Sequence, residues 1–176
     1  MKYLEIVDDI VQKNLAIADF WKSSQGWAPI SAAGLLSRSR LDRQVSLSYT
    51  LDRYNVIKKG IRFDGELIMG WVNLRSLCEG TIKWFLSVYH ETYIERPIGK
   101  NFEPDGVTFN PLIEYYEKNI KSKSDTWVRV LRHIQKRGNA IHAYQDKEIG
   151  NAGELRRYVL KYRNFLFDLD GRVPYP

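Results

Sequence analysis

Apolar residues recur at helical spacing along most of the chain, and glycine and proline stand between the periodic segments. The first such segment covers residues 3–21 and ends at the breaker-rich residues 23–29. Its apolar positions are Tyr3, Val7, Ile10, Ile17 and Trp21. This pattern predicts a first helix followed by a turn.

Two patterns overlap in residues 31–54. The apolar residues from Leu35 to Val45 have helical spacing, whereas those from Val45 to Leu51 alternate as they do in a strand. We interpret the whole segment as a helix. Its expected partner is a long helix over residues 64–93, with a broad apolar face formed by Leu67, Trp71, Leu74, Leu77, Cys78, Thr81, Trp84, Phe85 and Val88.

Residues 94–110 combine two prolines and two glycines with mixed charges. This composition predicts an exposed loop without regular structure, and such a loop is able to cover a site. Pro111 suits the first turn of a helix that runs to about Lys121. A further helix is expected over residues 125–144, capped by Ser124 or Asp125.

The last periodic segment, residues 153–169, carries a nearly ideal amphipathic stripe and ends at Gly171 and Pro174. The sequence therefore predicts an all-α fold in a single domain over residues 1–176. It has at least five helices and no substantial sheet. Residues 125–144 are expected to lie antiparallel to residues 153–169 across a shared apolar seam.

The composition fits one folded domain. Of the 176 residues, 44% are hydrophobic, 27% charged and 13% aromatic, values typical of soluble globular proteins. Cys78 is the one cysteine, which excludes an internal disulfide and a cysteine-based zinc site and favours a reducing, cytoplasmic location. Acidic residues near the start and the absence of a long apolar run argue against a secretory signal and a membrane span.

The net charge of +6 is unevenly distributed. Residues 121–176 hold 12 Lys and Arg against 6 Asp and Glu, whereas residues 1–120 hold 15 of each. A basic surface attracts polyanions such as RNA, although a modest excess of this kind is also common on solvated helices.

The segment with the most distinctive chemistry is residues 136–144, which reads KRGNAIHAY. Arg137 and His142 are separated by four residues there, and this spacing resembles the Arg-x4-6-His motif of HEPN-domain proteins. Many members of that family are metal-independent ribonucleases of bacterial toxin and defence systems. The resemblance covers residues 125–170 most closely and implies a HEPN-like antiparallel helical bundle.

The resemblance also implies roles for these residues. His142 would be the general acid and base, Arg137 would clamp the phosphate, and Asn139 would orient the imidazole or hold a phosphate oxygen. Lys136 and Tyr144 are further candidates for substrate contact. His133 shares a helical side with Arg137 and is a third.

On one continuous helix, the side chains of Arg137 and His142 would diverge by about 140°. A homodimer would solve this by bringing two copies of the helix together around one cleft. The implied activity needs RNA, a second copy of the chain and, in such systems, an antitoxin or defence-system partner protein. It needs no metal and no cofactor.

Two alternatives stay open. In the family, the arginine is often followed directly by a polar residue, whereas here Gly138 intervenes. The chain would then be a catalytically inactive HEPN-fold protein that binds RNA or mediates dimerisation, or a helical interaction protein with an incidental motif. Gly138 itself falls on the apolar face of its helix, which predicts a close approach to a neighbouring helix.

Other candidate sites have less support. His90 lies near a predicted helix end and Cys78 within an apolar stripe, so both are interpreted as structural residues. The three histidines are too scattered to form a recognisable metal site. No glycine-rich phosphate-binding motif is present in the sequence.

Overall fold

The computed structural model describes residues 2–122, 126–142 and 147–175, without the side chain of Arg62. Within these ranges it contains seven α-helices, two short 3-10 helices and one two-stranded ladder, which confirms the all-α prediction. The α-helices are α1 (Tyr3–Lys22), α2 (Ile30–Arg38), α3 (Leu41–Tyr49), α4 (Ile61–Val88), α5 (Phe109–Asn119), α6 (Trp127–Gly138) and α7 (Ala152–Asp170). The remaining elements are the 3-10 helices η1 (Thr50–Val56) and η2 (Asn139–Ile141) and the strands β1 (Ile94–Glu95) and β2 (Lys100–Asn101).

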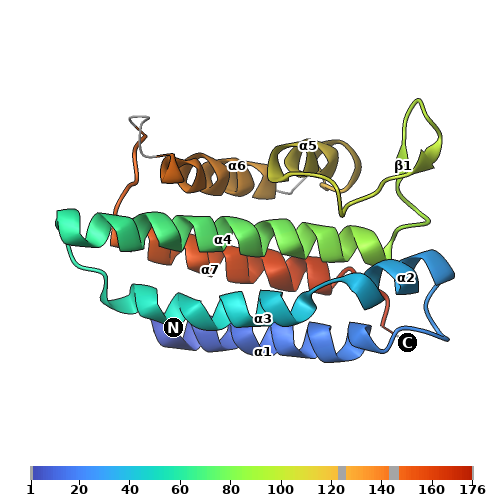
Figure 1. Cartoon of the computed structure of the whole chain (residues 1–176), viewed down its shortest axis with the longest axis horizontal. Helices are drawn as coiled ribbons and strands as arrows, with labels where there is room; N and C mark the ends of the chain where they lie inside the picture. The colour runs from blue at the N-terminus through green and yellow to red at the C-terminus, as the bar shows by residue number, and fades with distance from the viewer. Residues whose placement is uncertain (1, 123–125, 143–146, 176) are drawn as a thin grey trace.

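Helix α4 is the centre of the fold (Figure 1), where α7 lies beside it, α5 and α6 cover one side, and α1 and α3 lie on the other. Its sequence explains this position, because large apolar residues occur around much of its circumference. Trp71, Leu74, Leu77 and Ile82 are all fully buried. A helix that is apolar on several sides is stabilised by burial against several neighbours. One continuous hydrophobic core therefore joins the helices.

The prediction of one helix over residues 31–54 is wrong. The chain forms α2, then α3, then η1, and the break between α2 and α3 lies at Ser39 and Arg40. Ser39 has extended backbone angles, and both its amide N–H and its hydroxyl donate to the carbonyl oxygen of Leu36. A serine that bonds the backbone of the preceding turn in this way competes with continuation of the helix.

The segment 94–110 is not wholly irregular. Strands β1 and β2 pair antiparallel, with Ile94 opposite Asn101. The segment is also partly anchored, because Phe102 is buried and its ring stacks on that of Tyr115 at 3.9 Å. It lies at the opposite end of the molecule's long axis from the C-terminal end of α6 (Figure 1), so it does not cover the predicted motif.

The helix predicted over residues 125–144 is shorter than expected. Helix α6 ends at Gly138, a 3-10 turn covers Asn139–Ile141, and His142 follows that turn. The wheel argument for the divergence of Arg137 and His142 therefore does not apply. The proposed caps Ser124 and Asp125 lie outside the described residues.

The close approach predicted at Gly138 is confirmed, and its neighbour is α4. A Cβ at this position would lie 2.9 Å from Cδ of Arg75 and 3.4 Å from the carbonyl oxygen of Trp71. Helix α6 is antiparallel to α7, as predicted (Figure 1), but it packs more extensively on α4 than on α7. The expected apolar seam with α7 is thus only part of the surface that α6 buries.

Candidate functional site

Arg137 and Glu154 form the main polar contact between α6 and α7. The Nη2 group of Arg137 donates to both carboxylate oxygens of Glu154, at 3.0 and 3.3 Å. The two side chains are 11% and 13% exposed. This is a largely buried ion pair whose geometry is well suited to hydrogen bonding.

The segment before α7 completes the environment of Arg137. The Nη1 group donates to the backbone carbonyl oxygen of Glu148 at 2.7 Å and to its carboxylate at 3.0 Å. Gly150 has a φ of +71°, and a Cβ there would clash with Glu154 and lie 3.3 Å from Nε of Arg137. Glycine is therefore required for the segment to approach the pair this closely. Asn151 then caps α7 by accepting the amide N–H of Glu154 at 2.9 Å.

His133, one turn before Arg137 on α6, shares the same carboxylate. Its Nε2 lies 2.7 Å from Oε1 of Glu154. Its ring stacks on Tyr158 of α7 with centroids 4.2 Å apart and planes 12° apart. The ammonium group of Lys161 lies 4.2 Å from the centroid of Tyr158. Trp71 of α4 meets both rings edge-on and donates its indole N–H to the carbonyl oxygen of Ile149.

The electrostatics of Glu154 follow from these partners. Burial raises the pKa of this carboxyl group, but the hydrogen bonds and charge of Arg137, and then those of His133, outweigh that effect. The pKa therefore lies below its ordinary value, and Glu154 is ionised at neutral pH. An ionised carboxylate only accepts hydrogen bonds, so Nε2 of His133 is the donor in its contact with Glu154.

This arrangement changes the role expected for Arg137. Both terminal nitrogens are bonded to acceptors within the chain, and Nε is buried without a partner among the described residues. The guanidinium is thus not available to clamp a phosphate unless Glu148 and Glu154 release it. In this structure it holds the end of α6 to the start of α7.

Of the other predicted site residues, Lys136, Asn139 and His142 form no side-chain hydrogen bond or ion pair with this cluster within the described ranges. His142 and Lys136 are exposed, and their side chains contact no polar partner in the described part of the chain. The backbone carbonyl of Asn139 accepts the amide N–H of His142 at 3.3 Å, but no interaction joins their side chains. Tyr144 lies outside the described residues.

Exposed cations occur on the same two helices as the His133–Tyr158 stack. On α6, Arg129, His133 and Lys136 fall within one arc of the helix, and on α7 Arg157, Tyr158 and Lys161 do so. Arg129, Lys136 and Arg157 have no partner among the residues that the structure describes. We call these residues the basic seam, and they are Arg129, His133, Lys136, Arg157, Tyr158 and Lys161.

Sequence reasoning missed Glu154 and Glu148. The sequence around Glu154 indicated only a helix start. Glu154 lies three residues after Asn151, in the first turn of α7, where the helix dipole favours an acidic residue. Nothing local indicates that it faces Arg137, because that contact depends on how two helices pack.

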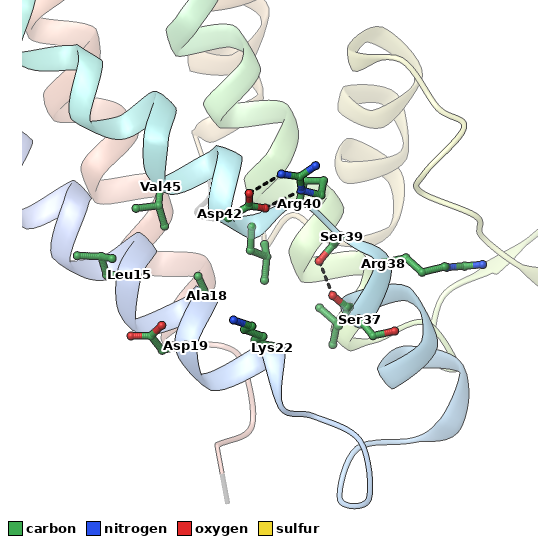
Figure 2. Close-up of a pocket in the computed structure, with 12 residues that line it drawn as sticks. Leu15, Ala18, Asp19, Lys22, Ser37, Arg38, Ser39, Arg40, Asp42 and Val45 are labelled. Atoms are coloured by element: carbon green, nitrogen blue, oxygen red, sulfur yellow. Dashed lines mark hydrogen bonds and ion pairs between the residues drawn. The ribbon is translucent and has the colours of Figure 1, made fainter.

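A cavity of about 540 Å³ lies elsewhere, between the C-terminal end of α1 and the connection from α2 to α3. Figure 2 shows Lys22 and Asp19 at its edge, and the guanidinium of Arg40 paired with Asp42. The hydrogen bonds from Arg40 lower the pKa of Asp42 to about 2. None of the predicted site residues lines this cavity.

Comparison of the chain with protein-family models, with curated proteins and with solved structures finds no match. The resemblance to HEPN-domain proteins therefore rests on the sequence motif, and the structure shows only that the fold is mostly helical. No helix in the described ranges is long and apolar enough to cross a membrane.

Proposed function

We propose that this protein is a HEPN-like, metal-independent endoribonuclease of toxin or defence type that binds RNA along the basic seam and acts as a homodimer. The proposal rests on the Arg137 to His142 spacing and on the clustering of exposed cations on α6 and α7. An antitoxin or defence-system protein is its expected protein partner.

The basic seam is the observation that carries the proposal. Arg129, Lys136 and Arg157 are exposed cations without internal partners in the described chain. Such groups gain most from binding a phosphate backbone, because RNA then releases its condensed counterions. The half-buried Tyr158 and His133 rings stack on each other on the same two helices, and we propose that bases and riboses pass along them.

The motif suggests His142 as the acid and base, and its imidazole is exposed. A second imidazole, that of His133, belongs to the basic seam. Arg137 contributes differently in this proposal. It contacts phosphate only in a state in which Glu148 and Glu154 have moved away. In the present conformation it binds these two glutamates and holds α6 to the start of α7.

The occupied guanidinium of Arg137 favours a second candidate, a catalytically inactive HEPN-fold module that binds RNA or mediates dimerisation. In that case, the motif arginine is a structural residue, and the basic seam binds RNA without cutting it.

Fluorescence anisotropy with a labelled single-stranded RNA in EDTA tests RNA binding, and gel analysis of the same samples tests cleavage. We expect saturable binding at about 50 mM salt that weakens by at least tenfold at about 200 mM. The double variant Lys136→Glu with Arg157→Glu should weaken binding far more than Lys22→Glu with Arg43→Glu. The control pair makes the same change of charge at exposed positions on α1 and α3.

Binding with cleavage supports the nuclease, and binding without cleavage supports the inactive module. Lack of saturable binding, or equal loss in the two double variants, overturns the proposal.

A further inference from the structure

We propose that His133, and not His142, is the imidazole that accepts the ribose 2′-hydroxyl proton, with Glu154 and Arg137 as positioning residues. The inference rests on the proposed ribonuclease function and concerns which histidine carries it out. Three features distinguish His133 from His142: its orientation, its open nitrogen and its place in the basic seam.

The ring of His133 is held in one orientation. Its Nε2 donates to Glu154 at 2.7 Å, and its face stacks on Tyr158 at a centroid distance of 4.2 Å. A carboxylate that accepts from one ring nitrogen fixes the tautomer, so that the other nitrogen carries the lone pair. Nδ1 of His133 is therefore the proton acceptor. His142, by contrast, is exposed and has no side-chain partner in the described part of the chain.

The Nδ1 atom of His133 is not fully buried. The side chain is 27% exposed, and Nδ1 is not among the buried polar atoms that lack a partner. No hydrogen bond to another described residue occupies it. A base must reach its proton within about 3 Å, and no described residue competes for this nitrogen.

Arg137 acts through Glu154. Its two hydrogen bonds, at 3.0 and 3.3 Å, fix both carboxylate oxygens, and one of these oxygens accepts from His133. The guanidinium also keeps Glu154 ionised, because it lowers the pKa of that carboxyl group. The resulting chain runs from Arg137 to Glu154 to His133, the order in which a buried acid orients a catalytic imidazole.

The chemical step balances without a metal or another reagent. Nδ1 of His133 takes the 2′-hydroxyl proton while O2′ forms a bond to phosphorus and the bond from phosphorus to O5′ breaks. Water protonates the leaving 5′-oxygen, and the imidazolium returns its proton to solvent. The products are a 2′,3′-cyclic phosphate and a 5′-hydroxyl. Lys136 and Arg129, on the same arc of α6, are placed to attract the phosphate.

Matched substitutions in the full chain test the inference. His133→Gln retains an amide able to donate to Glu154, and His142→Gln is its control. We expect cleavage of RNA in EDTA to fall by about 10²- to 10⁴-fold in His133→Gln and by less than about threefold in His142→Gln. The loss of cleavage in His133→Gln should greatly exceed any loss of RNA binding in the same variant, and thermal melting should verify that both variants fold.

The pH dependence of cleavage by Glu154→Gln distinguishes a positioning role of Glu154 from a purely structural role. The acid limb of the pH dependence of cleavage should shift to lower pH, because a neutral amide no longer stabilises the imidazolium. An unchanged profile in a folded Glu154→Gln variant overturns the inference.

The inference is also overturned if His142→Gln abolishes cleavage while His133→Gln does not, or if the wild type binds RNA without cutting it. Those outcomes leave RNA binding intact. Absence of RNA binding by the wild type overturns the proposed function itself.

Discussion

The guanidinium of Arg137 is neutralised by two carboxylates within its own chain, which limits what the motif does in this conformation. Glu148 is 76% exposed and Glu154 only 13% exposed. The Glu148 contact is therefore screened by water and weak, whereas the Glu154 contact is protected. An arginine in such a motif can bind phosphate only if its guanidinium is not already paired with carboxylates of its own chain. Here the better protected partner also holds His133.

We expect Glu154→Gln to lower the unfolding free energy at pH 7 by about 1 kcal/mol, because the charge-assisted bonds from Arg137 and His133 weaken. The pKa of Glu154 is lower in the folded chain than its ordinary value of 4.5. Its contribution is therefore complete above that value and is lost as the pH falls through the folded-state pKa. Urea unfolding between pH 7 and pH 3 measures this.

The difference in stability between wild type and Glu154→Gln should shrink as the pH falls below the ordinary carboxyl pKa of 4.5 and through the lower folded-state pKa. Glu148→Gln serves as the exposed control and should change stability by less than about 0.5 kcal/mol. A difference between wild type and Glu154→Gln that stays constant down to pH 3 would contradict the assigned ion pair.

Helical periodicity predicted the long elements well because their apolar faces are buried. Helices α1 and α7 lie within one residue of the expected ranges, whereas α4 covers Ile61–Val88 in place of the expected residues 64–93. The predicted helix ends are wrong where a local hydrogen bond or a local turn ends the helix. Ser39 ends α2 through its own side chain, and the 3-10 turn after Gly138 ends α6. The spacing of apolar residues does not indicate where either helix ends.

Gly138→Ala tests the close packing of α6 on α4. A Cβ would lie 2.9 Å from Cδ of Arg75, and the rigid carbonyl oxygen of Trp71 lies on the same side. We expect a loss of about 1 to 2 kcal/mol in unfolding free energy, measured by urea denaturation, despite the better helix propensity of alanine. Any loss of RNA cleavage should follow this loss of stability, because no catalytic atom is removed.

The matched control for this variant is Gly34→Ala. Gly34 lies inside α2, and a Cβ there would meet no atom within 4 Å. This variant should gain up to about 1 kcal/mol from helix propensity. If the two glycine variants behave alike, the packing explanation for Gly138 is wrong.

Contacts within one helix of the site could be predicted from the sequence, whereas contacts between two helices could not. Arg137 and His133 lie four residues apart, and the sequence therefore predicted a shared helical side. Glu154 and Tyr158 belong to a helix that follows a long connection, and their contact with His133 depends on how α6 and α7 pack together on α4. The single domain over residues 1–176, the RNA target and the partner protein stay predictions.

The oligomeric state distinguishes the two proposed sites of RNA cleavage. If Arg137 and His142 from two copies of the chain share one site, the protein must be a dimer, and light scattering at micromolar concentration should give about twice 20.6 kDa. Ile141, which is 46% exposed beside His142, is the natural apolar contact for such a dimer. Ile141→Glu should therefore yield a monomer.

The His133 site, in contrast, lies within one chain. If His133 is the base, the Ile141→Glu monomer should retain cleavage per chain within about threefold of the wild type. If His142 acts across a dimer interface, cleavage should disappear with the dimer, and in the wild type it should fall steeply on dilution. A wild type that is monomeric and active would reject the composite site and leave the site formed by His133, Glu154 and Arg137.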